Sequence, residues 1–164
     1  MMDLLLEFAG SGRIGPIHGG MTLNEASEIL GPGHPHPAIR MLGERADGYP
    51  YNWESLSLDI TRNQVSSITL KVWPGGTFTA PSPLDQRHEP QDSTVTKHEF
   101  LAALNKAQIG YKDVEIPATD QQSAIHFVNT GVSAIFGFFE ESELITLAGN
   151  YLISVSKDCT RDIL

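Results

Sequence analysis

The chain has 164 residues, of which 40% are hydrophobic, so it can bury the core of one ordinary domain or of two half-size units. Its formal net charge of −9 repels phosphate backbones, and we therefore expect no direct contact with nucleic acid. The acidic excess favours rapid encounter with a basic partner, although many acidic chains have no such role.

The cysteine usage and the N-terminal segment predict a cytoplasmic protein. Cys159 is the single cysteine and cannot form an internal disulfide, which fits a reducing compartment. Asp3 and Glu7 occupy positions at which a signal peptide is positively charged. No run of about 18 apolar residues occurs, so we expect no association with a membrane.

Two helices are predicted near the start of the chain. Residues 3–9 predict a short helix that ends at Gly10, a residue suited to a left-handed cap. Thr22 and Glu25 have the spacing of a capping box, in which each side chain accepts a hydrogen bond from the backbone of the other. The apolar face that follows predicts a second helix, which Gly31 stops.

A hairpin is predicted in the middle of the first half. We expect irregular chain over residues 31–37, a short strand over 39–42 and a loop over 43–50. Apolar and polar residues then alternate over 55–60, the period of a half-buried strand. The β-branched residues of 65–72 predict the strand that pairs with it.

Residues 74–95 break this pattern with four prolines and two adjacent glycines, and predict an extended linker or a long surface connection without a long helix. Thr96 and Glu99 repeat the capping box and predict another helix.

The rest of the chain predicts antiparallel strands. Residues 111–116 are expected to be extended, and strands are predicted over 124–128, 132–139, 144–147 and 152–155. An acidic turn is expected between the second and third of these strands.

Together these elements predict an α+β fold of two tandem helix-plus-antiparallel-sheet units. The first α-β-β-β unit covers residues 1–73, the linker covers 74–95, and the second α-β-β-β unit covers 96–164. The matching capping boxes are consistent with an internal duplication, but two such units also arise by chance. The residues expected in the core are Ile29, Leu30, Leu56, Leu58, Ile60, Ile68, Leu70, Leu101, Leu104, Ile125, Phe127 and Ile135.

The sequence contains no motif of a known catalytic, cofactor or metal site. His34 and His36 are an i, i+2 pair, but no cysteine or carboxylate stands beside them at ligand spacing. We therefore expect no catalytic residue, no cofactor and no metal. The alternative is an unrecognised enzyme that uses a histidine such as His18 or His126 in a deep pocket.

Two groups of residues are candidates for binding another protein. Tyr49, Tyr51 and Trp53 cluster around the first hairpin, where aromatic side chains are either interface anchors or part of the core, and the same alternatives apply to Trp73. The acidic candidates of the second half are Asp113, Glu115, Asp120, Glu140, Glu141 and Glu143. The alternative for the acids is that they only solvate turns.

The segment of residues 17–33, "IHGGMTLNEASEILGPG", and the hairpin "LSLDI" followed by "VSSITL" resemble immunity proteins encoded beside polymorphic bacterial toxins. The segment "NTGVSAIF", residues 129–136, resembles the second half of those proteins. The helix motif alone is also similar to the β-lactamase inhibitor protein and to a small outer-membrane assembly lipoprotein. The resemblance implies a non-enzymatic binding fold, and no binding residue can be transferred because contact surfaces vary in such proteins.

From these observations we expect an immunity protein that binds and neutralises a cognate secreted toxin. The acidic charge predicts that this toxin is basic, for instance a nuclease. The alternative from another class is a scaffold or self-associating domain without a toxin partner. A toxin gene next to this one would distinguish the two.

Overall fold

The computed structural model describes residues 1–43, 47–85, 89–116 and 121–163. The helices are α1 (Met2–Ser11), α2 (Leu23–Leu30), α3 (Pro37–Leu42) and α4 (Lys97–Lys106), with a 3-10 turn, η2 (Thr160–Ile163), near the C-terminus. The strands are β1 (His34–Pro35), β2 (Tyr49–Trp53), β3 (Leu56–Thr61), β4 (Gln64–Lys71), β5 (Thr77–Phe78), β6 (Gln91–Asp92), β7 (Lys112–Val114), β8 (Gln122–Phe127), β9 (Val132–Phe139) and β10 (Gly149–Asp158).

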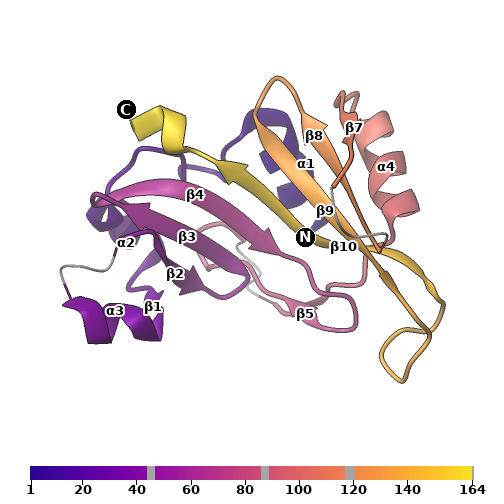
Figure 1. Ribbon diagram of the computed structural model, residues 1–164, viewed down its shortest axis with the longest axis horizontal. Coiled ribbons are helices and arrows are strands. Elements are labelled where there is room, and N and C mark those ends of the chain that lie inside the picture. The colour runs from indigo at the N-terminus through magenta and orange to yellow at the C-terminus, as the bar shows by residue number, and fades with distance from the viewer. Residues whose placement is uncertain (44–46, 86–88, 117–120, 164) are drawn as a thin grey trace.

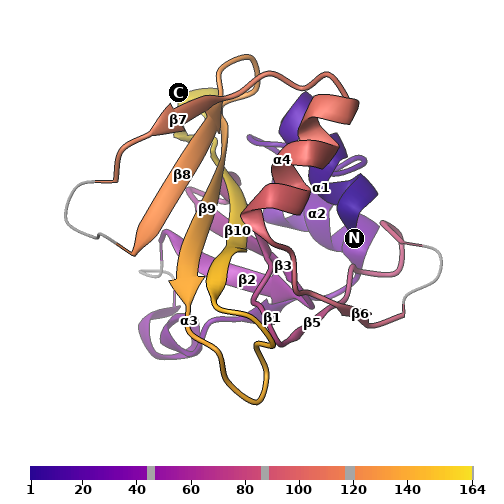
Figure 2. The same cartoon turned by 90° about the vertical axis from the view of Figure 1, so that its right-hand side faces the viewer.

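Eight of these strands form one antiparallel sheet, which confirms the α+β prediction. Their order across the sheet is β1-β2-β3-β4-β10-β9-β8-β7, and β5 pairs separately with β6. Figure 2 shows α1, α2 and α4 on one face of the sheet, whereas α3 lies near the β1 edge. No helix in the described part of the chain is long and apolar enough to cross a membrane.

The sheet consists of two meanders that meet through their last strands. Strands β1 to β4 follow α2, strands β7 to β10 follow α4, and β4 pairs with β10 where the two meanders join (Figure 1). The first unit therefore contains β1 and β2, which were not predicted, and the second contains β7 within the segment that was expected to be extended. The boundaries proposed at residues 73 and 96 stay a prediction.

The two meanders attach to their helices in the same way. The N–H of Val65 donates to the carbonyl of Met21, and the N–H of Leu152 donates to that of Val95, both at 2.8 Å. Met21 and Val95 each directly precede the threonine that caps a helix. The similarity is consistent with an internal duplication, which remains a prediction.

Both predicted capping boxes are confirmed. The N–H of Glu25 donates to Oγ1 of Thr22 at 3.2 Å, and the N–H of Thr22 donates to Oε2 of Glu25 at 2.7 Å. The corresponding bonds between Glu99 and Thr96 are 3.1 and 2.9 Å long. Each box supplies partners for backbone groups that have none within the helix.

Most of the predicted core is confirmed. Nine of the twelve residues are buried, and the three that are only partly buried are Ile29, Leu101 and Ile135. Ile135 alternates with the buried Ala134 and Phe136, so it faces the other side of the sheet. The sequence could not distinguish the two faces because apolar residues occur consecutively in β9.

Residues 74–95 contain no helix in their described part, as predicted, but they also contribute to the core. Phe78, Val95 and Ser93 are all nearly inaccessible to solvent. The β5–β6 pair and these buried side chains hold this segment against the sheet.

Several predictions about individual elements were wrong. Residues 39–42 are in helix α3 and not in a strand, because Pro37 occupies the first turn and His36 caps it. Helix α1 runs past Gly10 to Ser11 and is capped by Gly12, whose φ of 69° is left-handed. The predicted irregular stretch contains β1, and the loop predicted over 43–50 contains the start of β2.

The end of the chain also differs from the prediction. Residues 144–147 are loop and not strand, and β10 begins at Gly149, three residues before the strand predicted over 152–155. Leu144, Ile145 and Leu147 form a short apolar run that is typical of a strand, but this run lies in a loop in which Leu144 and Leu147 are exposed.

Candidate functional site

The aromatic candidates of the first hairpin lie on the side of the sheet that contributes to the core. Trp53 is buried, and its Nε1 donates to the carbonyl of Gly31 at 2.8 Å. Tyr51 packs against the core, and the ring of Tyr49 stacks on that of His36 with centroids 5.5 Å apart. Trp53 is therefore a core residue, which was the alternative to an interface anchor, and it cannot anchor a partner at the surface.

The acidic candidate residues lie in two separate regions of the structure. Asp113 and Glu115 lie on or next to the edge strand β7, whereas Glu140, Glu141 and Glu143 lie in the loop between β9 and β10, and all are exposed. In Figure 2, β7 is at the upper edge of the sheet and the β9–β10 loop projects from the opposite end. Asp120 lies outside the described residues.

The β9–β10 loop, residues 140–148, exposes apolar side chains together with its acids. Leu144 and Leu147 are 70% and 71% exposed. Trp73, at the end of β4, is 59% exposed, and its ring meets that of Phe139 edge to face with centroids 5.3 Å apart. We call Trp73, Leu144 and Leu147, with the glutamates at 140, 141 and 143, the loop patch.

Hydrogen bonds and one buried side chain fix this loop. Ile145 is only 4% exposed, although its neighbours in the loop face solvent. The N–H of Ser142 donates to the carbonyl of Ile145 at 2.9 Å, and the N–H of Ile145 donates to Oγ of Ser142 at 3.2 Å. The hydroxyl of Tyr151 donates to the carbonyl of Leu147 at 2.6 Å.

A glycine turn supports the loop from the side of the first meander. Gly75 has a φ of 75°, and a Cβ atom there would lie 2.7 Å from Cβ of Leu144 and 3.1 Å from its carbonyl oxygen. The turn follows Trp73 directly and closes with a bond from the N–H of Gly76 to the carbonyl of Trp73. The glycine therefore brings the loop and Trp73 together.

The corresponding connection in the first meander is much shorter. Strands β3 and β4 are joined only by Arg62 and Asn63, both with left-handed φ values of 51° and 63°. The second meander has nine residues, 140–148, at the same point of its topology. A tight turn is sufficient to join two antiparallel strands, so the longer loop is not needed for the fold.

The sheet face opposite α1, α2 and α4 has a row of polar side chains that the sequence analysis did not assemble. Cross-strand register brings one residue from each strand into this row, in the order His34, Asn52, Ser57, Thr69, Ser156, Ser133, His126 and Lys112. The serines and threonine at alternate strand positions were the available signal. That these residues form one row across the sheet follows only from the pairing of the strands.

This face of the sheet contains one hydrogen-bonded histidine–serine pair and one aspartate with a shifted pKa. Nδ1 of His126 lies 3.0 Å from Oγ of Ser133, a hydrogen bond across β8 and β9. In the neighbouring row, burial raises the pKa of Asp59, and the hydroxyl of Ser67 and the charge of Lys71 oppose this shift. A serine beside a histidine is one part of a nucleophilic site, but in the described part of the chain no carboxylate is hydrogen-bonded to this histidine to orient it.

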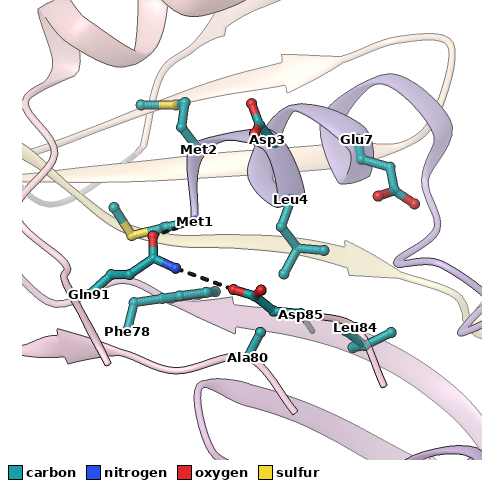
Figure 3. A pocket seen from close by; sticks show the side chains of 10 residues that line it. All are labelled: Met1, Met2, Asp3, Leu4, Glu7, Phe78, Ala80, Leu84, Asp85 and Gln91. Atoms are coloured by element: carbon teal, nitrogen blue, oxygen red, sulfur yellow. Dashed lines mark hydrogen bonds between the residues drawn. The ribbon is translucent and has the colours of Figure 1, made fainter. Parts of the chain in front are cut away.

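A cavity of about 400 Å³ lies beside the N-terminus of α1 (Figure 3). The terminal amine of Met1 donates to Oε1 of Gln91 at 2.8 Å, and Nε2 of Gln91 donates to Asp85 at 3.3 Å. Phe78 and Leu84 form part of its apolar wall. Neither His18 nor His126 lines this cavity, so it does not provide the histidine pocket that an enzyme hypothesis required.

Within residues 1–43, 47–85, 89–116 and 121–163, no three histidine, cysteine or acidic side chains are close enough to hold a metal ion. Cys159 is buried among core residues, which matches a structural role for this thiol. The loop patch is therefore the feature with the clearest capacity to bind, because it exposes apolar and acidic side chains on a fixed loop. Comparison of the chain with protein-family models, curated proteins and solved structures found no match.

Proposed function

We propose that this protein is an immunity protein that binds a cognate secreted bacterial toxin and neutralises it, with the loop patch as its contact surface. The observation that supports this is the exposure of Leu144 and Leu147 on a loop that is nevertheless fixed in place. Isolated exposed apolar residues are ordinary, but an apolar group on a projecting loop is typical of a contact surface.

The fixed conformation matters because ordering a mobile loop on binding opposes association by about 0.5–1.5 kcal/mol for each immobilised side chain. Ile145 and the bonds of Ser142 and Tyr151 order this loop before any partner arrives. Burial of an exposed leucine in a partner's pocket contributes about 1.5–3 kcal/mol. Two leucines on a preformed loop can thus form the centre of a binding surface.

The loop also explains how binding would neutralise an enzyme. It projects beyond the sheet in both views, so it can enter a concave surface that the face of the sheet cannot reach (Figures 1 and 2). Active sites are concave, and a protein loop that fills one excludes the substrate.

The experiment uses the secreted toxin domain encoded beside this gene. Bacteria that produce the toxin domain inside the cell should grow only when they also produce this protein, and the two purified proteins should form a complex. Leu144→Ser combined with Leu147→Ser should weaken the complex at least a hundredfold, because two apolar anchors are lost.

The matched control removes apolar surface elsewhere. Met41→Ser with Leu42→Ser changes two exposed residues of α3, which are 87% and 43% exposed, and should leave binding within a factor of two. Absence of both growth protection and a complex would contradict the immunity function. Equal weakening by the two double variants would show that the loop patch is not the contact surface.

A further inference from the structure

Strand β7 is an outer strand of the sheet, and no strand in the described part of the chain pairs with its free side. Such an edge presents backbone N–H and C=O groups that another strand can bind. The opposite edge is less suitable, because β1 has only two residues and one of them, Pro35, has no N–H to donate. The β7 edge is therefore the place at which the sheet can be extended.

The alternation of backbone hydrogen bonds shows which groups of β7 point outward. The N–H of Phe138 donates to the carbonyl of Gln121 at 2.8 Å, so Gln121 directs its backbone groups toward β9. This direction alternates along an antiparallel strand, and Ala124 therefore directs its groups toward β7. The register places Val114 opposite Ala124. It follows that the N–H and C=O of Asp113, one position earlier, point away from the sheet.

The side chains along this edge determine which kind of strand fits it. Asp113 and Glu115 are exposed and stand on the same face of the extended chain, whereas Val114 projects from the other face and is 44% exposed. Val114 and Ala124 also line a hollow of about 590 Å³ at this edge, together with Ile116. A strand with basic residues at alternate positions and an apolar residue between them brings opposite charges together and covers Val114.

We propose that the β7 edge binds an extended segment of a partner protein as a ninth, antiparallel strand of the sheet. This segment has one basic residue opposite Asp113, a second opposite Glu115, and an apolar residue between them. The backbone bonds hold the segment, and the side chains select its sequence. The surface lies at the other end of the sheet from the loop patch, so the inference does not depend on the proposed function (Figure 2).

The experiment titrates the full chain with the blocked peptide acetyl-Thr-Lys-Val-Lys-Thr-amide and follows the backbone amides by NMR. The peptide should bind with a Kd below about 1 mM. At a peptide concentration ten times the Kd, exchange of the Asp113 amide with water should slow about tenfold, because its N–H is then bonded to the peptide. The amide of Val114 already faces β8 and should change little.

Two N-methylated peptides separate strand pairing from the attraction of charges, since both keep the two lysines. Methylation of the backbone nitrogen of the second lysine removes the N–H that the C=O of Asp113 accepts, and should weaken binding about tenfold. Methylation at the valine changes an N–H that points away from β7, and should change binding less than about twofold.

The selection by charge is tested on both partners. Asp113→Asn combined with Glu115→Gln should weaken binding about fivefold at low salt, and a peptide with glutamates in place of the lysines should not bind. The inference is overturned if the lysine peptide does not bind, if the two methylated peptides are weakened equally, or if the glutamate peptide binds as well. None of these results bears on the immunity function, whose test uses the toxin and the loop patch.

Discussion

The hydroxyl of Tyr151, at the start of β10, donates a hydrogen bond of 2.6 Å to the carbonyl of Leu147 in the loop that precedes it. Tyr151 is itself 4% exposed, and its ring meets that of Phe139 with centroids 6.2 Å apart. A buried strand residue therefore holds the backbone next to an exposed leucine, and this couples the loop patch to the core.

Tyr151→Phe should remove this bond while the ring packing stays. We expect a loss of about 0.5–1.5 kcal/mol in the free energy of unfolding, the usual net value of one hydrogen bond. The amides of residues 142–147 should also exchange faster with solvent. If exchange in the loop is unchanged, the tyrosine does not order it.

Gly75→Ala should displace the loop as well as strain the turn. The new methyl group would lie 2.7 Å from Cβ of Leu144, in addition to the cost of a left-handed alanine, about 1–2 kcal/mol. Gly131→Ala is the control, because Gly131 has a similar φ of 73° and only a distant neighbour, Cε of Lys157 at 3.9 Å. We expect Gly75→Ala to be the more destabilising in urea by about 1–3 kcal/mol. Equal effects would mean that the contact with Leu144 relaxes freely.

The two capping boxes predict how stability depends on pH. Hydrogen bonds from the backbone and hydroxyl of Thr22 lower the pKa of Glu25 below 4.5, and Thr96 lowers that of Glu99 in the same way. A carboxyl whose pKa is lowered by folding stabilises the protein above its unfolded pKa. This contribution is lost as the pH falls from 4.5 through the folded value.

The urea midpoint should therefore decrease between pH 5 and pH 3, and the double variant Glu25→Gln with Glu99→Gln should decrease less. Glutamine keeps the capping geometry but does not titrate. Asp92 and Asp158, whose pKa values are lowered by bonds from Thr94 and Thr160, still titrate in both proteins. Parallel pH profiles for the two proteins would contradict the assignment to the capping boxes.

From the acidic residues Asp113 and Glu115 we predict that the β7 edge of the sheet does not pair with the β7 edge of a second copy of the chain. In a two-fold antiparallel pair, only residues from the same face of the sheet can stand opposite each other. There are four such registers, centred on residues 112, 113, 114 and 115. They place Lys112 opposite Lys112 of the second copy, Asp113 opposite Asp113, Asp113 opposite Glu115, and Glu115 opposite Glu115, respectively. Every one of these registers brings like charges together, which protects an exposed edge.

Replacement of Asp113 and Glu115 by threonine should thus promote self-association in analytical ultracentrifugation. Replacement of both by lysine should not, because like charges would again oppose one another. If neither variant associates, charge repulsion is not what keeps this edge free. This role for Asp113 and Glu115 differs from the contact with a toxin that their acidic character alone predicted.

The sequence was sufficient where local chemistry decides the structure. Thr22 and Thr96 began helices as predicted, because a capping box depends only on residues within one turn. The β3–β4 hairpin and β9 followed from alternation and β-branched residues. Helix α3 was missed although Pro37 was a usable signal, since the glycines and prolines of 31–37 favoured an irregular chain and residues 39–42 were assigned to a short strand.

The burial of individual side chains depends on contacts between distant segments, and the sequence did not predict it. From the sequence, Trp53 and Trp73 could each be either a core residue or an interface anchor. In the structure Trp53 lies in β2, which pairs with β3, and is buried, whereas Trp73 lies just after β4 and is exposed. The acidic turn was recognised from Glu140, Glu141 and Glu143. Its leucines were assigned to a strand, because the apolar run of residues 144–147 does not reveal whether a neighbouring strand pairs with it.

By itself the sequence determined the α+β class, the helix starts and the central strands, since these follow from hydrogen bonds and periodicity within short segments. Only the tertiary structure decided that the two meanders share one sheet through β4 and β10 and that the loop patch is both exposed and fixed. The reason is physical: whether a side chain is buried depends on which segments pack over it. The contact between Gly75 and Leu144, far apart in the chain, exists only once both meanders have folded together.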